Sequence, residues 1–205
     1  MRMNITILAS SLCLAACGGD DDGGDGGDGG NENEVITTVT LGFAPEGGGD
    51  AVTAAFNDPD GDGGDAPTVD PVALTDGVTY TLTVTFENRL EDPPEDITEE
   101  VADESDEHQI FYTGSAVDGP ASAQPEAPLT HSYADEDASG LPIGLENTIV
   151  AAAGTGELTV TLRHLPPVND EAVKVEDLAQ QVSAEGFGAL GGSTDAQVDF
   201  MVTVE

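Results

Sequence analysis

The chain is poor in cysteine and in basic residues, and each shortage excludes a class of protein. Its two cysteines, Cys13 and Cys17, both stand near the start. A disulfide framework, a cysteine nucleophile and a cysteine-based zinc site are therefore excluded from the rest of the chain. Four lysines and arginines stand against 41 aspartates and glutamates, which gives a formal net charge of −37. Because phosphate contacts need basic side chains, nucleic acid is excluded as a partner.

The acidic excess itself needs counter-ions. Either divalent cations bind at particular loops, or the protein works in abundant salt that screens the repulsion between its carboxylates. A marine or halophilic source would account for the bulk of the charge without any binding function. Catalysis has little support, because the sequence has neither a Gly-x-Ser-x-Gly elbow nor a P-loop lysine. We therefore expect a protein that is not an enzyme.

Residues 1–17 have the features of a bacterial lipoprotein leader. Arg2 gives a short positive segment, and the apolar run over 5–14 has the length of a signal-peptide core but is too short to span a bilayer. Leu14-Ala15-Ala16-Cys17 resembles the lipobox, in which the cysteine is acylated after cleavage. The alternative is an ordinary secretory leader cut nearby. We expect residues 1–16 to be removed and Cys17 to carry the lipid anchor.

The remaining chain divides into a tether and one domain. Residues 20–34 are glycine, aspartate, asparagine and glutamate with no apolar side chain, so they have nothing to bury. We expect residues 17–34 to form a lipid-attached, solvated tether. Residues 35–205 are enough for one domain with a real core.

Apolar and polar residues alternate along most of residues 35–205, which indicates strands with one buried and one solvated side. The clearest run is 78–86, and in 158–163 the same rhythm places Arg163 on the solvated side. In 35–43 it places Val35 with the buried residues. Strands are predicted at 35–43, 51–56, 68–74, 78–86, 109–113, 129–133, 145–152, 158–163 and 198–204.

This pattern predicts an all-β fold, an immunoglobulin-like antiparallel β-sandwich of about 7–9 strands. An up-and-down barrel is the alternative. Short helices are expected at 96–101, after two prolines, and at 175–182, both as insertions at the ends of the sandwich. Residues 116–128 are rich in proline and small residues, so we expect a loop there.

Two acidic loops have spacings typical of calcium sites. In residues 58–63 carboxylates alternate and a glycine follows at the sixth position, as in the first half of an EF-hand loop. Position twelve is Val69, so Asp65 or Asp70 would have to substitute for the usual glutamate. The second loop matches the whole spacing if a serine serves at position five. Hard-cation candidates are thus Asp58, Asp60, Asp62 and Asp65 in the first loop, and Asp135, Asp137, Ser139 and Glu146 in the second. The alternative for both is an acidic hairpin turn.

The histidines suggest a site for a softer ion. If the acidic run 99–108 is helical, Glu104 and His108 share one face, and carboxylate–imidazole sets bind zinc or copper. The alternation of buried and solvated residues in their strands places His108, His131 and His164 on the core side, each near a strand end. Three histidines at one rim would make a transition-metal site. The alternative is three partly buried histidines, each hydrogen-bonded to a neighbouring acid.

Four motifs in this order resemble a known family: Glu95-Asp96-Ile97-Thr98-Glu99-Glu100, Asp106-Glu107-His108-Gln109-Ile110-Phe111-Tyr112, Gly140-Leu141-Pro142-Ile143-Gly144-Leu145 and Leu158-Thr159-Val160-Thr161-Leu162-Arg163-His164. The family is a group of small lipoproteins of uncharacterised function, common in Bacteroidota and relatives. They are sometimes labelled "type 1 periplasmic binding fold superfamily". The label implies a two-lobed solute-binding protein, whereas the strand pattern predicts a sandwich. His108 and His164 lie within the shared motifs, which ranks them above His131. The acids after Cys17 also resemble signals that export such lipoproteins to the cell surface.

Together these observations predict a lipid-anchored outer-membrane protein, on the periplasmic face or the cell surface, that binds a cation. The ion is calcium at the aspartate loops, or zinc or copper at Glu104, His108 and His164. The membrane is a partner through the lipid, and a TonB-dependent transporter is a further expected partner. The alternative is a structural or adhesive envelope module with no small ligand. A secreted hydrolase has the least support.

Overall fold

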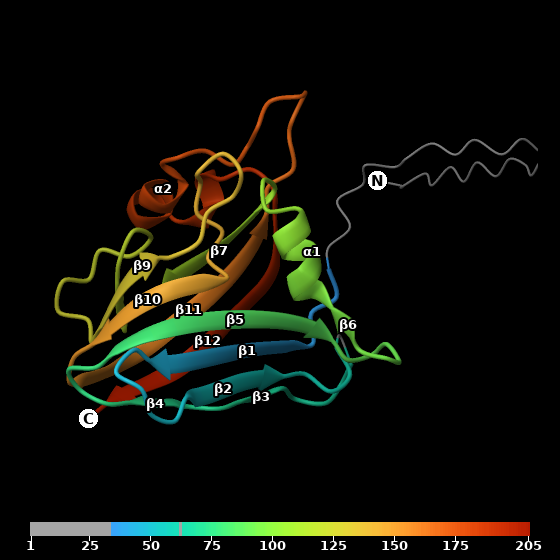
Figure 1. Ribbon diagram of the computed structural model, residues 1–205. Helices are drawn as coiled ribbons and strands as arrows, with labels where there is room; N and C mark the ends of the chain where they lie inside the picture. The colour runs from blue at the N-terminus through green and yellow to red at the C-terminus, as the bar shows by residue number, and fades with distance from the viewer. Residues whose placement is uncertain (1–33, 62) are drawn as a thin grey trace, which may run out of the picture. The chain divides into compact units, whose positions relative to one another are not determined.

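The computed structural model describes residues 34–61 and 63–205, and these form an all-β fold of two sheets (Figure 1). The predicted all-β sandwich is confirmed. The signal peptide, the lipidated Cys17, the tether up to residue 33 and Asp62 lie outside the described residues. Within the described ranges, no helix has both the length and the apolar character needed to cross a membrane.

The larger sheet has the strand order β3-β2-β1-β5-β10-β9-β8, with β6 paired to β5. Its strands are β1 (Thr38–Pro45), β2 (Val52–Asn57), β3 (Thr68–Val69), β5 (Thr79–Asn88), β6 (Glu95–Asp96), β8 (Val117–Asp118), β9 (Leu129–Tyr133) and β10 (Glu146–Ala151). Neighbouring strands are antiparallel except β8 and β9. β8 falls within the segment predicted as a loop.

The smaller sheet has the order β4-β12-β11-β7. Its strands are β4 (Val72–Leu74), β7 (His108–Thr113), β11 (Gly154–His164) and β12 (Ser193–Val204). The pair β4 and β12 is parallel. The strand predicted at 68–74 is divided between the two sheets, because the chain leaves β3 after Val69 and enters β4 at Val72. This division and the two-residue strands raise the number of strands above the prediction.

The main core lies between the sheets and follows the predicted alternation. From β5 it receives Tyr80, Leu82, Val84 and Phe86, all nearly inaccessible to solvent, and from β12 it receives Phe200 and its alternate neighbours. Each such side chain stabilises the fold by about 1.5–3 kcal/mol through burial. Val35 was predicted on this buried face and is 51% exposed, because β1 begins only at Thr38.

A second apolar cluster covers the opposite face of the smaller sheet. Phe111 of β7 packs there with Leu178 and Val182 of α2 (Leu178–Glu185), next to the short 3-10 helix η1 (Phe187–Ala189). The prediction placed this helix at the end of the sandwich, whereas α2 lies against a face of the smaller sheet. For the same reason Arg163 is 7% exposed rather than solvated. Its guanidinium donates to Thr194 Oγ1 at 2.7 Å and to the Gly191 carbonyl at 2.6 Å.

Helix α1 (Ile97–Asp103) connects β6 to the segment before β7. The side chain of Asp96 accepts from the Thr98 amide, which is typical of a helix N-cap. Ile97 and Val101 are buried in the main core and fix the helix on the sandwich. The helix ends at Asp103, so the helical face predicted to join Glu104 and His108 does not form. His108 instead begins β7.

Candidate metal site at one end of the sandwich

His108 and His164 face each other across two adjacent strands. His108 is the first residue of β7 and His164 the last of β11, and the two are direct partners in the antiparallel register. Their imidazole rings stack with centroids 4.7 Å apart and planes 8° from parallel. The His108 side chain is 3% exposed and that of His164 is 16% exposed. The end of this strand pair therefore presents two imidazoles side by side, one of them reachable from solvent.

A backbone hydrogen bond determines which nitrogen His108 can offer to a ligand. Its Nδ1 lies 3.1 Å from the carbonyl oxygen of Glu104. Because a carbonyl only accepts, Nδ1 carries the proton and the neutral ring keeps its lone pair on Nε2. Metal-binding histidines are commonly oriented by such a bond from the second ring nitrogen.

Glu104 completes a group of three. It follows α1 directly and its side chain is exposed. One ligand atom each from Glu104, His108 and His164 lies within 4.8 Å of the other two, and no other group of three histidines, cysteines or acids in residues 34–61 and 63–205 meets this condition. The predicted helix joining Glu104 to His108 was wrong, because the helix ends at Asp103, but the three residues do come together.

The spacing is somewhat wider than a bound ion needs. Zinc bonds of about 2.0–2.1 Å in a tetrahedron place ligand atoms roughly 3.4 Å apart. Since the three ligand atoms lie within 4.8 Å of one another, the group must contract by up to about 1.4 Å around an ion of this kind. The exposed Glu104 can supply most of this movement through side-chain rotation.

Asp195 adds a buried carboxylate beside His108. Leu162 pairs with Ala196 and Arg163 with Thr194, so Asp195 is the extra residue of a β-bulge in β12. A bulge re-aims a side chain, and that of Asp195 is fully inaccessible to solvent. Its Oδ2 has no hydrogen-bond partner among the described residues and lies 4.0 Å from His108 Nε2. Burial raises the pKa of Asp195, while the nearby imidazoles act in the opposite direction.

Glu107 is the third acid at this end of the strands. Its Oε2 lies 3.5 Å from Nε2 of His164. Three carboxylates thus surround two imidazoles at the ends of β7 and β11. Sequence reasoning missed Asp195, because uninterrupted alternation from Phe200 puts residue 195 on the outer side. No sequence signal at that point reveals the bulge.

The first predicted calcium loop turns its carboxylates onto its own backbone. Asp58 Oδ1 accepts from the Asp60 amide at 3.4 Å, and Asp60 Oδ2 accepts from the Asp65 amide at 3.1 Å. The Asp65 side chain is exposed. Within the described part of this loop the carboxylates do not converge as a group of three. Calcium binding there stays a prediction, since Asp62 lies outside the described residues.

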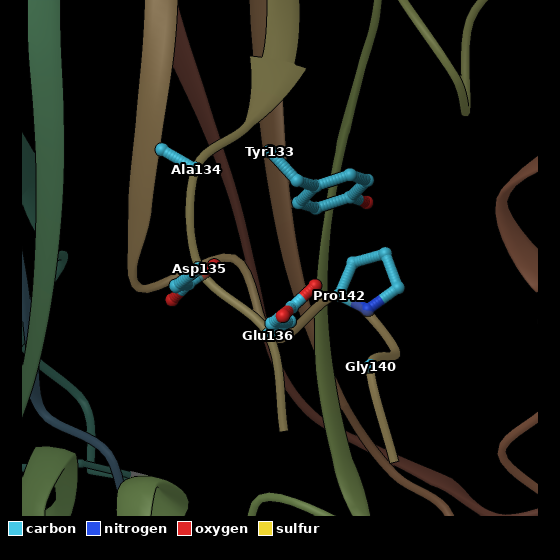
Figure 2. A pocket seen from close by; sticks show the side chains of 6 residues that line it. All are labelled: Tyr133, Ala134, Asp135, Glu136, Gly140 and Pro142. Carbon is cyan, nitrogen blue, oxygen red and sulfur yellow. The ribbon is translucent and has the colours of Figure 1, made fainter. Parts of the chain in front are cut away.

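The second predicted calcium loop follows β9, where Figure 2 shows Asp135 and Glu136 below Tyr133, with Glu136 beside Pro142. The two oxygens of Asp135 accept from the amides of Gly144 and Glu146 at 2.8 and 2.9 Å. Its carboxylate thus fastens the loop to the start of β10.

Asp137 is engaged more completely. Its Oδ1 accepts from the amides of Ser139 and Leu141 at 2.8 and 2.9 Å, and its Oδ2 lies 2.8 Å from Lys174 Nζ. Burial by itself would raise the pKa of Asp137, but Lys174 and the two amides outweigh it and lower the pKa. Ser139 contributes an amide here and Glu146 is exposed. A lysine ammonium thus stands where this loop was predicted to hold a metal ion.

His131 belongs to the core rather than to the metal group. It is 3% exposed, and its Nε2 lies 2.9 Å from Asn147 Oδ1. The ring packs against Tyr112 and Tyr133 with centroids 4.6 and 4.8 Å away. Burial lowers its pKa, and the bond to Asn147 opposes that effect. Two of the three histidines therefore come together, and the third is a buried histidine bonded to an amide.

No protein-family model, curated protein or solved structure matches the chain. Fold and site together define an all-β sandwich with a histidine–carboxylate cluster at one end.

Proposed function

We propose that this protein is a non-enzymatic outer-membrane lipoprotein whose sandwich binds a transition-metal ion, zinc or copper, at Glu104, His108 and His164. The observation that carries the proposal is the register of β7 with β11, which sets two histidines opposite each other with a glutamate oxygen within 4.8 Å. Imidazole and carboxylate together suit zinc and copper.

The surroundings of the site favour a doubly charged ion. Asp195 is buried with an unpartnered oxygen next to His108, and Glu107 lies beside His164. A buried carboxylate without a partner is unfavourable, and a cation at the imidazoles would relieve that cost. Calcium at the aspartate loops has less support, because backbone amides and Lys174 already engage most of those carboxylates.

The location of the protein in this proposal depends on the leader sequence. Acylation at Cys17 would anchor the acidic tether in the outer membrane, on the periplasmic face or the cell surface. A metal-binding domain at that place would capture ions for an outer-membrane transporter of the TonB-dependent class. The resemblance to small Bacteroidota lipoproteins is compatible with this role.

Isothermal titration of the whole chain carrying Cys17→Ser, with zinc, copper(II) and calcium, tests the proposal. We expect zinc or copper to bind and to raise the melting temperature. At a hundredfold excess over Kd, a ligand stabilises the fold by about 2.7 kcal/mol, or roughly 5–10 °C for a domain of this size. His164→Ala and His108→Ala should each abolish the effect, and Glu136→Gln, an exposed acid of the Asp135 loop, should preserve it.

Two results would count against the metal site. One is the absence of heat with either metal at neutral pH. The other is binding that survives the His108→Ala/His164→Ala double variant. Either would leave a structural or adhesive module of the envelope as the better description.

A further inference from the structure

The β11–β12 connection, residues 165–192, leaves the smaller sheet and returns to it at the histidine cluster and carries α2 and η1 (Figure 1). It begins directly after His164, which ends β11. It ends directly before Ser193, which begins β12 two residues ahead of the buried carboxylate of Asp195. Each end of the connection is therefore joined through the chain to a side chain of the cluster.

Two hydrogen bonds attach the connection to the strand segment that supplies the other ligands. The Leu165 amide donates to the Glu107 carbonyl at 2.6 Å. The Lys174 ammonium donates to the Ser105 carbonyl at 2.7 Å. Both carbonyls belong to residues 104–108, which contribute the glutamate and one histidine of the metal group. The connection thus contacts both sides of the site.

Arg163 fastens the far end of the connection. Its guanidinium donates to the Gly191 carbonyl at 2.6 Å and to Thr194 Oγ1 at 2.7 Å. Arg163 directly precedes His164, and Thr194 directly precedes Asp195. Because these bonds lie one residue from both side chains, displacement of the connection would move both of them.

The connection is held on the outer face of the smaller sheet by few apolar side chains. Its buried apolar residues are Leu165, Leu178, Ala179 and Val182, and they form a cluster with Phe111 that is separate from the main core. Stabilisation by burial grows with the apolar area removed from water, so this small contact stabilises docking far less than the core stabilises the sandwich.

The covered face also contains buried polar atoms that oppose docking. In the register of β7 with β11, Thr161 is the partner of Phe111 and Arg163 is the partner of Gln109, so these side chains share the face under the connection. Thr161 Oγ1, Arg163 Nε and Gln109 Oε1 have no hydrogen-bond partner among the described residues. Such groups are unfavourable when buried, and detachment of the connection would return them to water. The connection therefore has the features of a unit that opens locally.

We propose that docking of the β11–β12 connection regulates the metal site. In the docked state the connection holds His164 and Asp195 in place around the ion. When α2 leaves the sheet, the site loses this geometry and releases the ion. Because coupling between two sites is reciprocal, a bound ion in turn holds α2 on the sheet. This inference rests on the proposed zinc or copper site and adds a means of releasing its ion.

Hydrogen exchange of the whole chain carrying Cys17→Ser, followed by mass spectrometry with and without zinc, tests the coupling. Without metal we expect the amides of α2 to exchange faster than those of β5, because α2 opens locally and β5 opens with the whole domain. At a hundredfold excess of zinc over Kd, exchange in α2 should slow by up to about a hundredfold. Equal rates in α2 and β5 without metal, or rates in α2 that bound zinc does not change, would overturn the inference.

A pair of matched variants tests the effect of docking on affinity. Leu178→Asp/Val182→Asp places two charges against the covered face and should detach α2, whereas Ser183→Asp/Ala184→Asp places the same charges on the exposed side of the same helix. Since only the docked fraction keeps the site assembled, the first variant should bind zinc about 10–100-fold more weakly in calorimetry. The second should retain its affinity within about twofold, and equal affinities of the two variants would contradict the proposal.

The outcomes separate this inference from the proposed function. If Leu178→Asp/Val182→Asp does not fold, Leu178→Ala/Val182→Ala replaces it, and its α2 amides should exchange faster without metal and slow again with zinc. Absence of zinc and copper binding by the parent chain would remove the proposed function and this inference together. Tight zinc binding by a folded variant with α2 detached would overturn the regulation alone and leave the metal site in place.

Discussion

The ammonium of Lys174 lies 2.8 Å from Oδ2 of Asp137, and only 1% of each side chain is exposed. The same ammonium donates to the carbonyl of Ser105 at 2.7 Å. Lys174 therefore fastens the loop after β9 to the segment that leads into His108. Burial lowers the pKa of Lys174, and the pairing with Asp137 opposes that effect.

Breaking this buried pair should destabilise the domain strongly. Lys174→Met leaves a buried aspartate without its counter-charge, which typically lowers the free energy of unfolding by about 3–5 kcal/mol. Urea unfolding at neutral pH measures the change. Arg89→Met removes an exposed pair, with side chains 52% and 35% accessible, and should cost under about 1 kcal/mol. If Lys174→Met prevents folding, Lys174→Met/Asp137→Asn should restore it, because asparagine removes the charge and keeps an oxygen that accepts from the amides of Ser139 and Leu141. Equal effects at Lys174 and Arg89 would refute the account.

The same aspartate makes stability depend on pH in the acid range. The folded pKa of Asp137 lies below its ordinary value of 3.8. Its ionised form therefore contributes stability that is fully present above 3.8 and is lost as the pH falls through the folded pKa. The difference in unfolding free energy between the wild type and Asp137→Asn should be constant near neutral pH and should shrink in strong acid. A difference that grows in acid would contradict the lowered pKa.

Asp195→Asn should separate stability from metal binding. The folded pKa of Asp195 is raised, so its charge is unfavourable to folding at neutral pH and that penalty disappears as the pH falls below the folded pKa. The neutral amide should stabilise the metal-free domain by on the order of 1 kcal/mol, or a few degrees of melting temperature. The zinc-induced rise in melting temperature should become smaller. A variant that is less stable without metal would show that the carboxylate serves the fold alone.

Gly192 controls the position of His164. It has φ of +74°, and a Cβ there would lie 2.0 Å from the carbonyl oxygen of His164. Gly192→Ala should therefore lower the unfolding free energy by about 1–3 kcal/mol and weaken zinc binding by moving His164. Gly188→Ala is the control, because nothing lies within 4 Å of a Cβ at that position. Differential scanning calorimetry with and without zinc compares them, and undisturbed zinc binding in Gly192→Ala would argue against this positioning.

The strands that bury only one face were the most predictable part of the fold. In β5 the alternation of Tyr80, Leu82, Val84 and Phe86 with threonines determines which side meets the core, and the structure agrees. The rule fails in β7 and the end of β11, because α2 covers their second face. Phe111 and Arg163 are buried by residues far away in the chain, and periodicity within one strand carries no information about such a cover.

The candidate site was only partly predictable for the same reason. The alternation within each strand places His108 and His164 on the core side near strand ends. Their stacking depends on the register of two strands that are far apart in the sequence and adjacent in the sheet. The bulge at Asp195 turns this side chain from the outer face to the inner face, and no glycine or proline in the bulge indicates it. The Asp137 loop has the composition of a cation site, and its cation is one of only four basic residues in the chain.

The placement of β12 also affects how the chain matures. Residues 193–204 form an inner strand, flanked by β4 and β11, and β4 joins its sheet through β12 alone. Strand β4 is made early and its only partner in this sheet is made late, so the burial of Val72 and Leu74 must wait until β12 has been synthesised and has paired.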